Sequence, residues 1–142
     1  IHYTISSDEF GNKSLTVNSI KFSEEFMKFV NYNHHKEKTL KPKLLSLKEN
    51  TLCSVLAGLM DCDGGSGGNK ICFYNTYTNL VNFFVRAMKK LGISTTFRRR
   101  MPGQSKIISK KGIERKIIGK KHCIEVIVGS LQGFRKFKKI TK

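Results

Sequence analysis

Two acidic residues separated by one position, Asp61 and Asp63, are the side chains best suited to chemistry in this sequence. They end an apolar run and precede the glycine-rich segment 64–68. Carboxylate oxygens are ligands that Mg²⁺ prefers, whereas Asp and Gly are also common in a simple turn after a core helix. A calcium-binding EF-hand loop is excluded, because the twelfth position counted from Asp61 is Cys72 and not Glu. The residues alone leave a metal site and a turn both open.

The other candidate metal ligands are the four cysteines Cys53, Cys62, Cys72 and Cys123. None of them forms a C-x-x-C pair, and no H-x₃₋₅-H follows, so their spacing argues against zinc. Cys53 lies in an apolar helical run, and Cys72 and Cys123 lie in strand-like runs. We therefore expect buried, reduced thiols in an intracellular protein.

The distribution of charge indicates a polyanionic partner. The chain of 142 residues has a formal net charge of +17. Residues 1–71 contain nine basic and eight acidic residues, whereas residues 72–142 contain eighteen basic residues and two acidic ones, Glu114 and Glu125. Such asymmetry favours nucleic acid as the partner. A Lys-rich solvated surface is the alternative, since Lys outnumbers Arg 21 to 6, but such a surface normally mixes both signs. No apolar run approaches the ~18 residues of a membrane span, so no membrane contact is expected.

Hydrophobic periodicity predicts the elements that must position these residues. Residues 2–5 and 14–22 are predicted strands, and a helix with Ser23 as its N-cap is predicted to follow. Residues 31–43 are polar and basic and contain Pro42, so we predict a linker there.

The second half of the chain has stronger signals. Ser46 and Glu49 have the S-x-x-E spacing of a capping box, which predicts the start of a helix. A further helix is predicted from Thr76 or Thr78 to a C-terminal glycine, Gly92. The remaining predicted elements are the strands 70–74, 95–100, 106–108, 115–118 and 124–128 and a closing helix, 130–137. Blocks of strands and helices joined by antiparallel turns indicate the α+β class.

Residues 56–64, Leu-Ala-Gly-Leu-Met-Asp-Cys-Asp-Gly, resemble the LAGLIDADG motif of the homing endonucleases at seven of nine positions. Met60 replaces the Ile of the motif, and Cys62 replaces its Ala. The run Cys-Phe-Tyr-Asn-Thr at 72–76 and the helix after it are also similar to this family, above all to the endonuclease domains of inteins. The resemblance covers about residues 36–142.

This resemblance implies a homing-endonuclease fold, an αββαββα repeat with a concave antiparallel DNA-binding sheet. Two motif helices of the family approach closely through small side chains, here Ser54, Ala57 and Gly58, and Asp61 lies near the helix end and shapes the turn. The second acid of the motif, Asp63 here, binds the metal, which is Mg²⁺ or another divalent cation such as Mn²⁺. Two metals can activate a water and stabilise the leaving oxygen of a phosphodiester, and the family cuts both DNA strands in this way.

Basic residues are expected to complete the catalytic site and to contact DNA. The family places a basic residue near each active site, and Lys38 and Lys41 lie at about that place, with ordinary solvated lysines as the alternative. Because alternate residues of a strand share a face, Arg98 and Arg100 are expected to lie together, and Arg can recognise guanine. Three consecutive arginines are also compatible with a nuclear-localisation patch. The residues predicted to bind DNA are Arg98, Arg99, Arg100, Lys106, Lys110, Lys111, Arg115, Lys116, Lys120 and Lys121.

We predict three parts: 1–35 as the C-terminal part of a first LAGLIDADG repeat, 36–45 as a linker and 46–142 as a repeat with its own motif helix and sheet. A faint similarity between 26–29 and 134–137, which lie 108 positions apart, supports this division. We therefore expect an N-terminal companion repeat or chain that supplies the second acidic ligand. A homodimer is the alternative.

The leading functional hypothesis is a site-specific homing endonuclease, or a fragment or subunit of one, that hydrolyses double-stranded DNA. Its expected location is intracellular: the cytoplasm or nucleoid of a bacterial or phage host, or an organelle. The alternatives are a non-cleaving DNA- or RNA-binding module derived from the family, such as a maturase or a regulator, and a degenerate intein endonuclease domain. Protein splicing is not expected, because residue 1 is Ile and residues 140–142 lack a terminal His-Asn.

Overall fold

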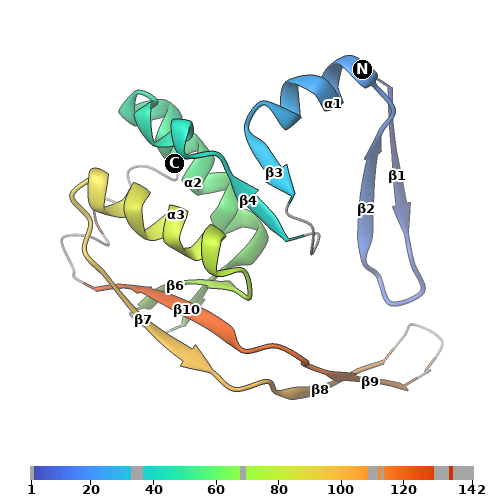
Figure 1. The fold of residues 1–142 in the computed structure, drawn as a ribbon. Coiled ribbons are helices and arrows are strands. Elements are labelled where there is room, and N and C mark those ends of the chain that lie inside the picture. Colours follow the sequence, from blue (N-terminus) through green and yellow to red (C-terminus); the bar gives the residue numbers. More distant parts are fainter. Residues whose placement is uncertain are drawn as a thin grey trace. The chain divides into compact units, whose positions relative to one another are not determined.

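Helices and antiparallel strands alternate along the chain in the computed structural model, which confirms the predicted α+β class (Figure 1). The chain divides into two compact units. One unit contains Ile1–Lys28 and Met101–Lys121, and the other contains Phe29–Arg100 and His122–Lys142. The residues that the structure describes are 2–32, 37–67, 70–108, 112, 114–129 and 135.

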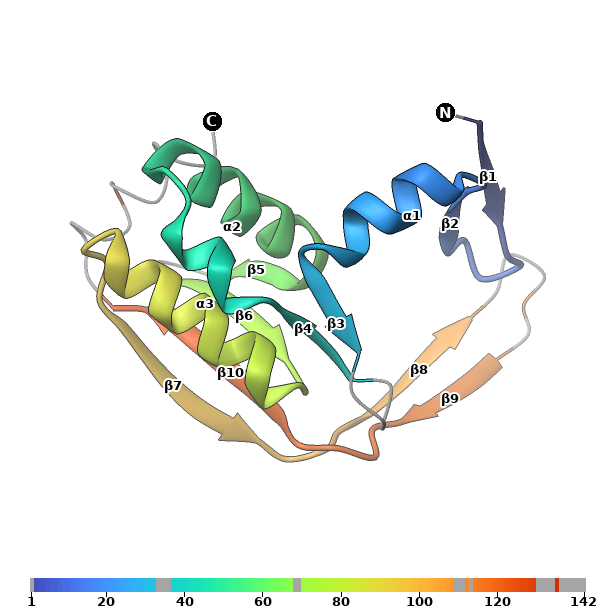
Figure 2. The same cartoon turned by 45° about the horizontal axis from the view of Figure 1, so that its top comes forward.

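The central element of the larger unit is a four-stranded antiparallel sheet in the order β5-β6-β10-β7, with two helices, α2 and α3, on one face (Figure 2). Leu52 and Leu56 of α2 and Phe84 of α3 are fully buried. They share one hydrophobic core with Phe73 and Val126 of the sheet, and the rings of Phe73 and Phe84 stack with centroids 4.3 Å apart. The bounds are β5 Gly64–Gly67, β6 Lys70–Asn75, β10 Cys123–Val128, β7 Thr95–Arg100, α2 Glu49–Asp63 and α3 Thr78–Lys90.

Helix α3 ends as predicted but begins differently. Gly92 has a φ of 69°, a left-handed conformation that favours glycine, so the predicted C-terminal glycine is confirmed. At the other end, the predicted Thr76 or Thr78 cap is wrong, because Tyr77 is the N-cap and its side chain makes no capping bond. The side chain of Asn75 satisfies the backbone instead, since its Oδ1 accepts a hydrogen bond from the backbone N of Tyr77 at 2.8 Å.

The start of α2 corrects the predicted capping box. Glu49 is the first helical residue, and the N-cap is Lys48, which makes no side-chain capping bond. Ser46 belongs to a preceding 3-10 helix, η1 (Pro42–Ser46), and its Oγ donates a hydrogen bond to the carbonyl oxygen of Lys43 at 2.6 Å. The proline therefore begins a separate turn that places Ser46 away from the helix start.

The polar segment predicted as a linker contains regular structure. Strand β3 (Val30–Tyr32) pairs with strand β4 (Lys38–Leu40) in antiparallel register, and η1 follows. Leu44 of η1 joins the hydrophobic core of the larger unit. The segment therefore contributes to packing, while the domain boundaries predicted at residues 35 and 45 stay a prediction.

Two antiparallel hairpins and a short helix are described in the smaller unit. The turn of the first hairpin is closed by Asp8, whose Oδ1 accepts hydrogen bonds from the backbone N of Phe10 and of Asn12, both at 2.9 Å. These bonds and a left-handed glycine, Gly11 with a φ of 83°, explain why the chain reverses there. The bounds are β1 Tyr3–Ser7, β2 Lys13–Val17, α1 Ile20–Met27, β8 Gln104–Ile108 and β9 Glu114–Ile118.

Helix α1 begins earlier than predicted. Ser19 is its N-cap, and the Ser19 Oγ accepts a hydrogen bond from the backbone N of Phe22 at 3.2 Å. The strand predicted to reach Phe22 therefore ends at Val17, and the predicted cap Ser23 is wrong. No residue of α1 is buried. Large apolar side chains of this unit are exposed, namely Tyr3, Ile5, Leu15, Ile20, Phe22 and Phe26.

The strands of the second half agree closely with the sequence-based predictions. Strand β7 has the predicted bounds, and β10 begins one residue earlier, at Cys123. Strands β8 and β9 begin at Gln104 and Glu114, two residues and one residue earlier than predicted. The closing helix predicted at 130–137 lies outside the described residues except for Arg135, which is helical.

Candidate functional site

Asp63, the predicted metal ligand, is the last residue of α2 and is exposed. The side-chain amide of Asn75 donates a hydrogen bond from Nδ2 to Asp63 Oδ2 at 2.7 Å. Because the Oδ1 of Asn75 is held by the backbone N of Tyr77, this amide has a fixed orientation and in turn orients the carboxylate. The role of Asn75 was not predicted from the sequence, because only the pairing of β5 with β6 brings Asn75 next to Asp63.

The glycine after Asp63 allows a direct passage from helix to strand. A Cβ on Gly64 would lie 2.4 Å from the carbonyl oxygen of Met60 and 2.4 Å from its Cε. Only glycine fits this approach, so β5 starts immediately after α2. Residues 64–67 thus form the strand β5 directly after α2.

Asp61, the other acid of the motif, is also exposed on α2. Residues two positions apart on a helix do not face each other, so Asp61 and Asp63 do not form a carboxylate pair within this chain. Among the residues that the structure describes, no group of three or more His, Cys, Asp or Glu side chains could hold a metal. One carboxylate still fits Mg²⁺, which proteins commonly bind through one or two carboxylates together with substrate phosphates.

Helix α2 has one buried face and one open face. Leu52, Cys53 and Leu56 lie in the core, whereas Ser54, Gly58 and Asp61 are exposed and Ala57 is partly exposed. Apart from the adjacent residues and the backbone of α2 itself, a Cβ built on Gly58 would meet no atom of the described chain within 4 Å. The small residues predicted to form a helix interface are therefore accessible to another helix.

A cluster of polar residues lies on the sheet face opposite the helices. In the strand register, Glu125 of β10 lies between Tyr74 of β6 and Arg98 of β7. The Glu125 carboxylate is 2% exposed and accepts hydrogen bonds from Arg98 Nε, from Arg100 Nε at 2.9 Å and from Arg100 Nη2 at 3.0 Å. Tyr74 donates from its hydroxyl to Glu125 Oε1 at 3.2 Å, and the Arg100 guanidinium lies 5.4 Å from the centre of the Tyr74 ring. We call these four residues the Glu125 cluster.

The charges of this cluster are strongly coupled. Hydrogen bonds from Arg98 and then Arg100 lower the pKa of Glu125 to about 2. The same carboxylate raises the pKa of both arginines. A hydrogen bond with Cys72, together with burial, raises the pKa of Tyr74 to about 12. At neutral pH the cluster therefore contains one carboxylate and two guanidinium ions.

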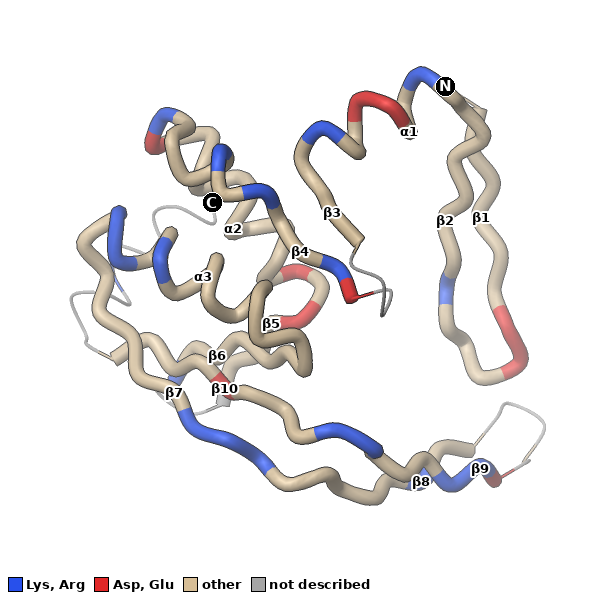
Figure 3. Tube along the Cα trace, viewed as in Figure 1, with Lys and Arg blue, Asp and Glu red and all other residues tan. Residues whose placement is uncertain are grey.

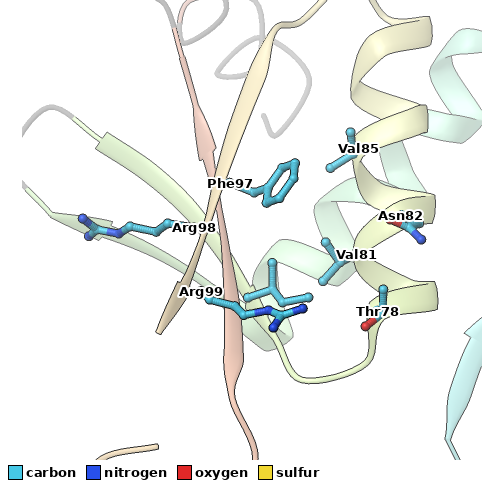
Figure 4. A pocket seen from close by; sticks show the side chains of 8 residues that line it. Thr78, Val81, Asn82, Val85, Phe97, Arg98 and Arg99 are labelled. Carbon is cyan, nitrogen blue, oxygen red and sulfur yellow. The ribbon is translucent and has the colours of Figure 1, made fainter. Parts of the chain in front are cut away.

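The three consecutive arginines do not share one surface. Figure 4 shows Arg98 and Arg99 pointing to opposite sides of β7. Arg99 borders a cavity of about 420 Å³ between α3 and the sheet, and the other residues around this cavity are Thr78, Val81, Asn82, Val85, Phe97, Arg98 and Ile124. The prediction that Arg98 and Arg100 share a face is confirmed by their common carboxylate.

The predicted DNA-binding lysines and Arg115 belong to the smaller unit. Lys106 and Lys116 are register partners in the β8–β9 hairpin and are exposed. The Nζ of Lys106 lies 2.6 Å from a carboxylate oxygen of Glu114, and Arg115 lies over the ring of Phe10. Figure 3 shows Lys and Arg residues along β7 and again between β9 and β10, where Lys120 and Lys121 are exposed. Lys110 and Lys111 lie outside the described residues.

The two candidate catalytic lysines lie at the first residue of β4 and at the residue directly after it. Lys38 is its first residue and is exposed. Lys41 follows the strand, and its backbone N donates to the carbonyl oxygen of Phe29 at 2.9 Å. Both belong to the unit that contains Asp63, and their catalytic role stays a prediction.

The family model for the LAGLIDADG-like domain matches residues 50–140, which include all of α2 but its first residue, the sheet and the Glu125 cluster. The chain therefore belongs to the LAGLIDADG family, which comprises homing endonucleases and related proteins. Endonucleases of this family generally depend on divalent metals, and its members generally bind DNA as dimers or as repeats. A search of curated proteins finds no match to the sequence. No helix in the described part of the chain is long and apolar enough to cross a membrane.

Proposed function

We propose that this chain is a site-specific DNA endonuclease of the homing type, or a subunit of one, that hydrolyses phosphodiesters with Mg²⁺ or Mn²⁺. The observation that carries the proposal is the exposed Asp63 carboxylate at the end of the motif helix, oriented by Asn75. A carboxylate at this position that accepts a hydrogen bond from a second side chain supports a role as a metal ligand more than a role in shaping a turn. The proposed location is intracellular, in a bacterial or phage host or in an organelle.

In this proposal, Asp63 offers one oxygen to the cation while its other oxygen stays on Asn75. The bound cation would supply Lewis acidity at the phosphate and lower the pKa of an attacking water. The peptide chain supplies the position of the ligand, because α2 and β5 meet at Asp63 without an intervening loop. Lys38 and Lys41 are proposed to stabilise charge near the phosphate.

The second acidic ligand is proposed to come from a companion repeat or chain, N-terminal to this one, with a homodimer as the alternative. Its motif helix would pack on the open face of α2, through Ser54, Ala57 and Gly58. The exposed apolar side chains of the smaller unit also support a companion, since isolated domains rarely leave so many large apolar residues in water. The proposed arrangement would place two carboxylates side by side.

A non-cleaving DNA- or RNA-binding module, such as a maturase or a regulator, is the second candidate, and an inactive intein endonuclease domain is a variant of it. The observation that favours it is that, among the described residues, no group of three or more His, Cys, Asp or Glu side chains surrounds Asp63 or could hold a metal. Both candidates use the basic residues to bind nucleic acid, so binding alone cannot separate them.

Metal binding and cleavage separate the two candidates. Duplexes selected by the chain from a randomised pool are incubated with Mg²⁺ or Mn²⁺, using the wild type, Asp63→Asn and the matched control Asp61→Asn. We expect Asp63→Asn to bind these duplexes normally, to lose Mn²⁺ binding measured by electron paramagnetic resonance, and to lose cleavage. Asp61→Asn should keep both properties.

Each other outcome has a distinct meaning. Cleavage by Asp63→Asn at the wild-type rate would show that Asp63 is not a catalytic residue. Duplex binding without Mn²⁺ binding by the wild type would favour the non-cleaving module. Sedimentation of the isolated chain tests the companion, because a stable symmetric dimer that makes double-strand cuts unaided would contradict it.

A further inference from the structure

Among the described residues, Glu125 is the one charged side chain that is buried. It is 2% exposed and lies on the sheet face opposite the helices. Its two carboxylate oxygens accept hydrogen bonds from two arginines and a tyrosine. These partners come from the two strands on either side of β10. A carboxylate engaged in this way has little capacity left for a metal, so its role must lie in what it does to its neighbours.

Among the described residues, Glu125 binds one edge of each guanidinium and no side chain binds the other edge. Arg100 donates to it from Nε and Nη2, which form the side edge of the guanidinium, so the end edge with Nη1 remains available. Arg98 donates from Nε, so both of its terminal nitrogens remain available. The side chains of Arg98 and Arg100 are 55% and 49% exposed, so these free nitrogens are accessible to a ligand.

The plane of Arg100 is fixed by a second contact. Its guanidinium lies over the ring of Tyr74, and the hydroxyl of Tyr74 is itself bonded to Glu125. Arginine normally loses much rotamer freedom when it binds a ligand. Here that freedom is already restricted by the protein, as in a preorganised site. A fixed planar edge matters for a directional acceptor pair such as guanine O6 and N7, and much less for a phosphate.

We propose that Glu125 is a specificity-determining residue that positions Arg98 and Arg100 for guanine recognition in the major groove. This inference rests on the proposed function, because it requires that the uncovered sheet face binds duplex DNA. Glu125 itself touches no base. It is a positioning residue that acts through the two arginines.

Because Glu125 is negatively charged, its effect on the positions of the two arginines can be distinguished from its effect on the general electrostatic attraction to DNA. A carboxylate beneath two guanidinium ions reduces the net charge of the cluster from +2 to +1. It therefore weakens the attraction to any phosphate backbone while it fixes the arginines. A surface that only held phosphates would gain nothing from a buried carboxylate. Removal of this charge should thus have opposite effects on the preference for guanine and on general DNA affinity.

The test compares the wild type with Glu125→Gln on a pool of duplexes whose central region is randomised. The bound fraction is sequenced, and affinity for the unselected pool is measured in parallel. We expect the wild type to select guanine at fixed positions and Glu125→Gln to reduce that preference at least about five-fold at those positions. Affinity of Glu125→Gln for the unselected pool should be equal or higher. A merely structural role would lower both quantities together.

A second variant covers the case in which Glu125→Gln does not fold, as judged by circular dichroism. The double variant Arg98→Lys with Arg100→Lys keeps the charge and a partner for Glu125 but removes the planar edge. It should lose the guanine preference and keep its affinity for the unselected pool. Arg86→Lys, at an exposed position of α3 on the helix-covered side of the sheet, is the matched control and should keep both.

Besides a parallel loss of preference and affinity in Glu125→Gln, two results would overturn the inference without affecting the proposed function. One is wild-type binding to duplexes with no guanine preference. The other is an unchanged preference in a folded Glu125→Gln or in the lysine double variant. Absence of any duplex binding by the wild type would instead overturn the proposed function itself.

Discussion

Gly58 on the open face of α2 gives a prediction in which one substitution has two opposite effects. Glycine inside a helix is less favourable than alanine by about 0.5–1 kcal/mol. Because a Cβ at this position meets no described atom outside the adjacent residues and the backbone of α2 within 4 Å, Gly58→Ala should stabilise the isolated chain by about that amount. In an assembled pair of motif helices the same space is needed by the partner. Added side-chain volume should then cost ~1–3 kcal/mol, which weakens association about 5- to 150-fold.

Urea unfolding and sedimentation of the same samples measure the two effects. At protein concentrations at which the chain is monomeric, Gly58→Ala should raise the free energy of unfolding. Gly58→Leu should likewise fold as a monomer but lose assembly and DNA cleavage, because the facing helix has no room to retreat. Asn82→Ala, on an exposed position of α3, is the control that raises helix propensity and leaves assembly unchanged.

Either of two outcomes would contradict this prediction. Loss of stability in monomeric Gly58→Ala would mean that α2 is already covered at this position. Normal assembly and cleavage by Gly58→Leu would mean that another face of the helix forms the interface. Unfolding and sedimentation curves measure stability and assembly, and a cleavage assay on the same samples measures activity.

Three further predictions concern charge and the oriented carboxylate. Duplex affinity should fall with salt, each phosphate contact adding about −0.9 to the slope of log K against log salt, and a slope of zero in a titration would exclude the nucleic-acid partner. The pKa of Glu125 is lowered from 4.5 to about 2, so its contribution to stability is present above pH 4.5 and is lost as pH falls toward 2. That contribution is about 2 kcal/mol when solvent screening at the arginines is allowed for, and unfolding curves should show Glu125→Gln less stable at pH 7 and equal to the wild type near pH 2. Asn75→Ala should weaken Mn²⁺ binding roughly ten-fold through the loss of its bond to Asp63, and unchanged paramagnetic titrations would contradict that role.

Much of the larger unit could be predicted from the sequence because its signals are local. The apolar periodicity of α3 and the glycine at Gly92 define a helix and its end without help from the rest of the chain. The β-branched residues Thr95 and Thr96 at the start of β7 similarly indicate a strand, and its predicted bounds are correct. Two predicted helix starts were wrong because two local signals compete at each of them. Ser46 belongs to the 3-10 helix that begins at Pro42, and Ser19, not Ser23, is the N-cap of α1.

Residues of the candidate site were predicted from the sequence only where a single short segment contains the whole signal. Asp63 stands in a recognisable motif, and the shared face of Arg98 and Arg100 follows from strand alternation. Asn75 and Glu125 were missed because their partners are set by strand register, which brings together residues 12 and 25–51 positions apart in the sequence. One signal pointed to Glu125: it is one of only two acidic residues in the basic half of the chain.

The glycine that joins α2 to β5 has a consequence for how the candidate metal ligand can move. Asp63 lies between a helix and a strand with no flexible loop on either side, since Gly64 is already paired with Phe73. The backbone that carries the carboxylate therefore has no hinge of its own. To move this backbone, the chain must unwind the last turn of α2 or open the ladder between β5 and β6, and both are local unfolding events rather than loop motions. Amide hydrogen exchange in these two elements should then report the rate at which the backbone at Asp63 leaves its fixed position.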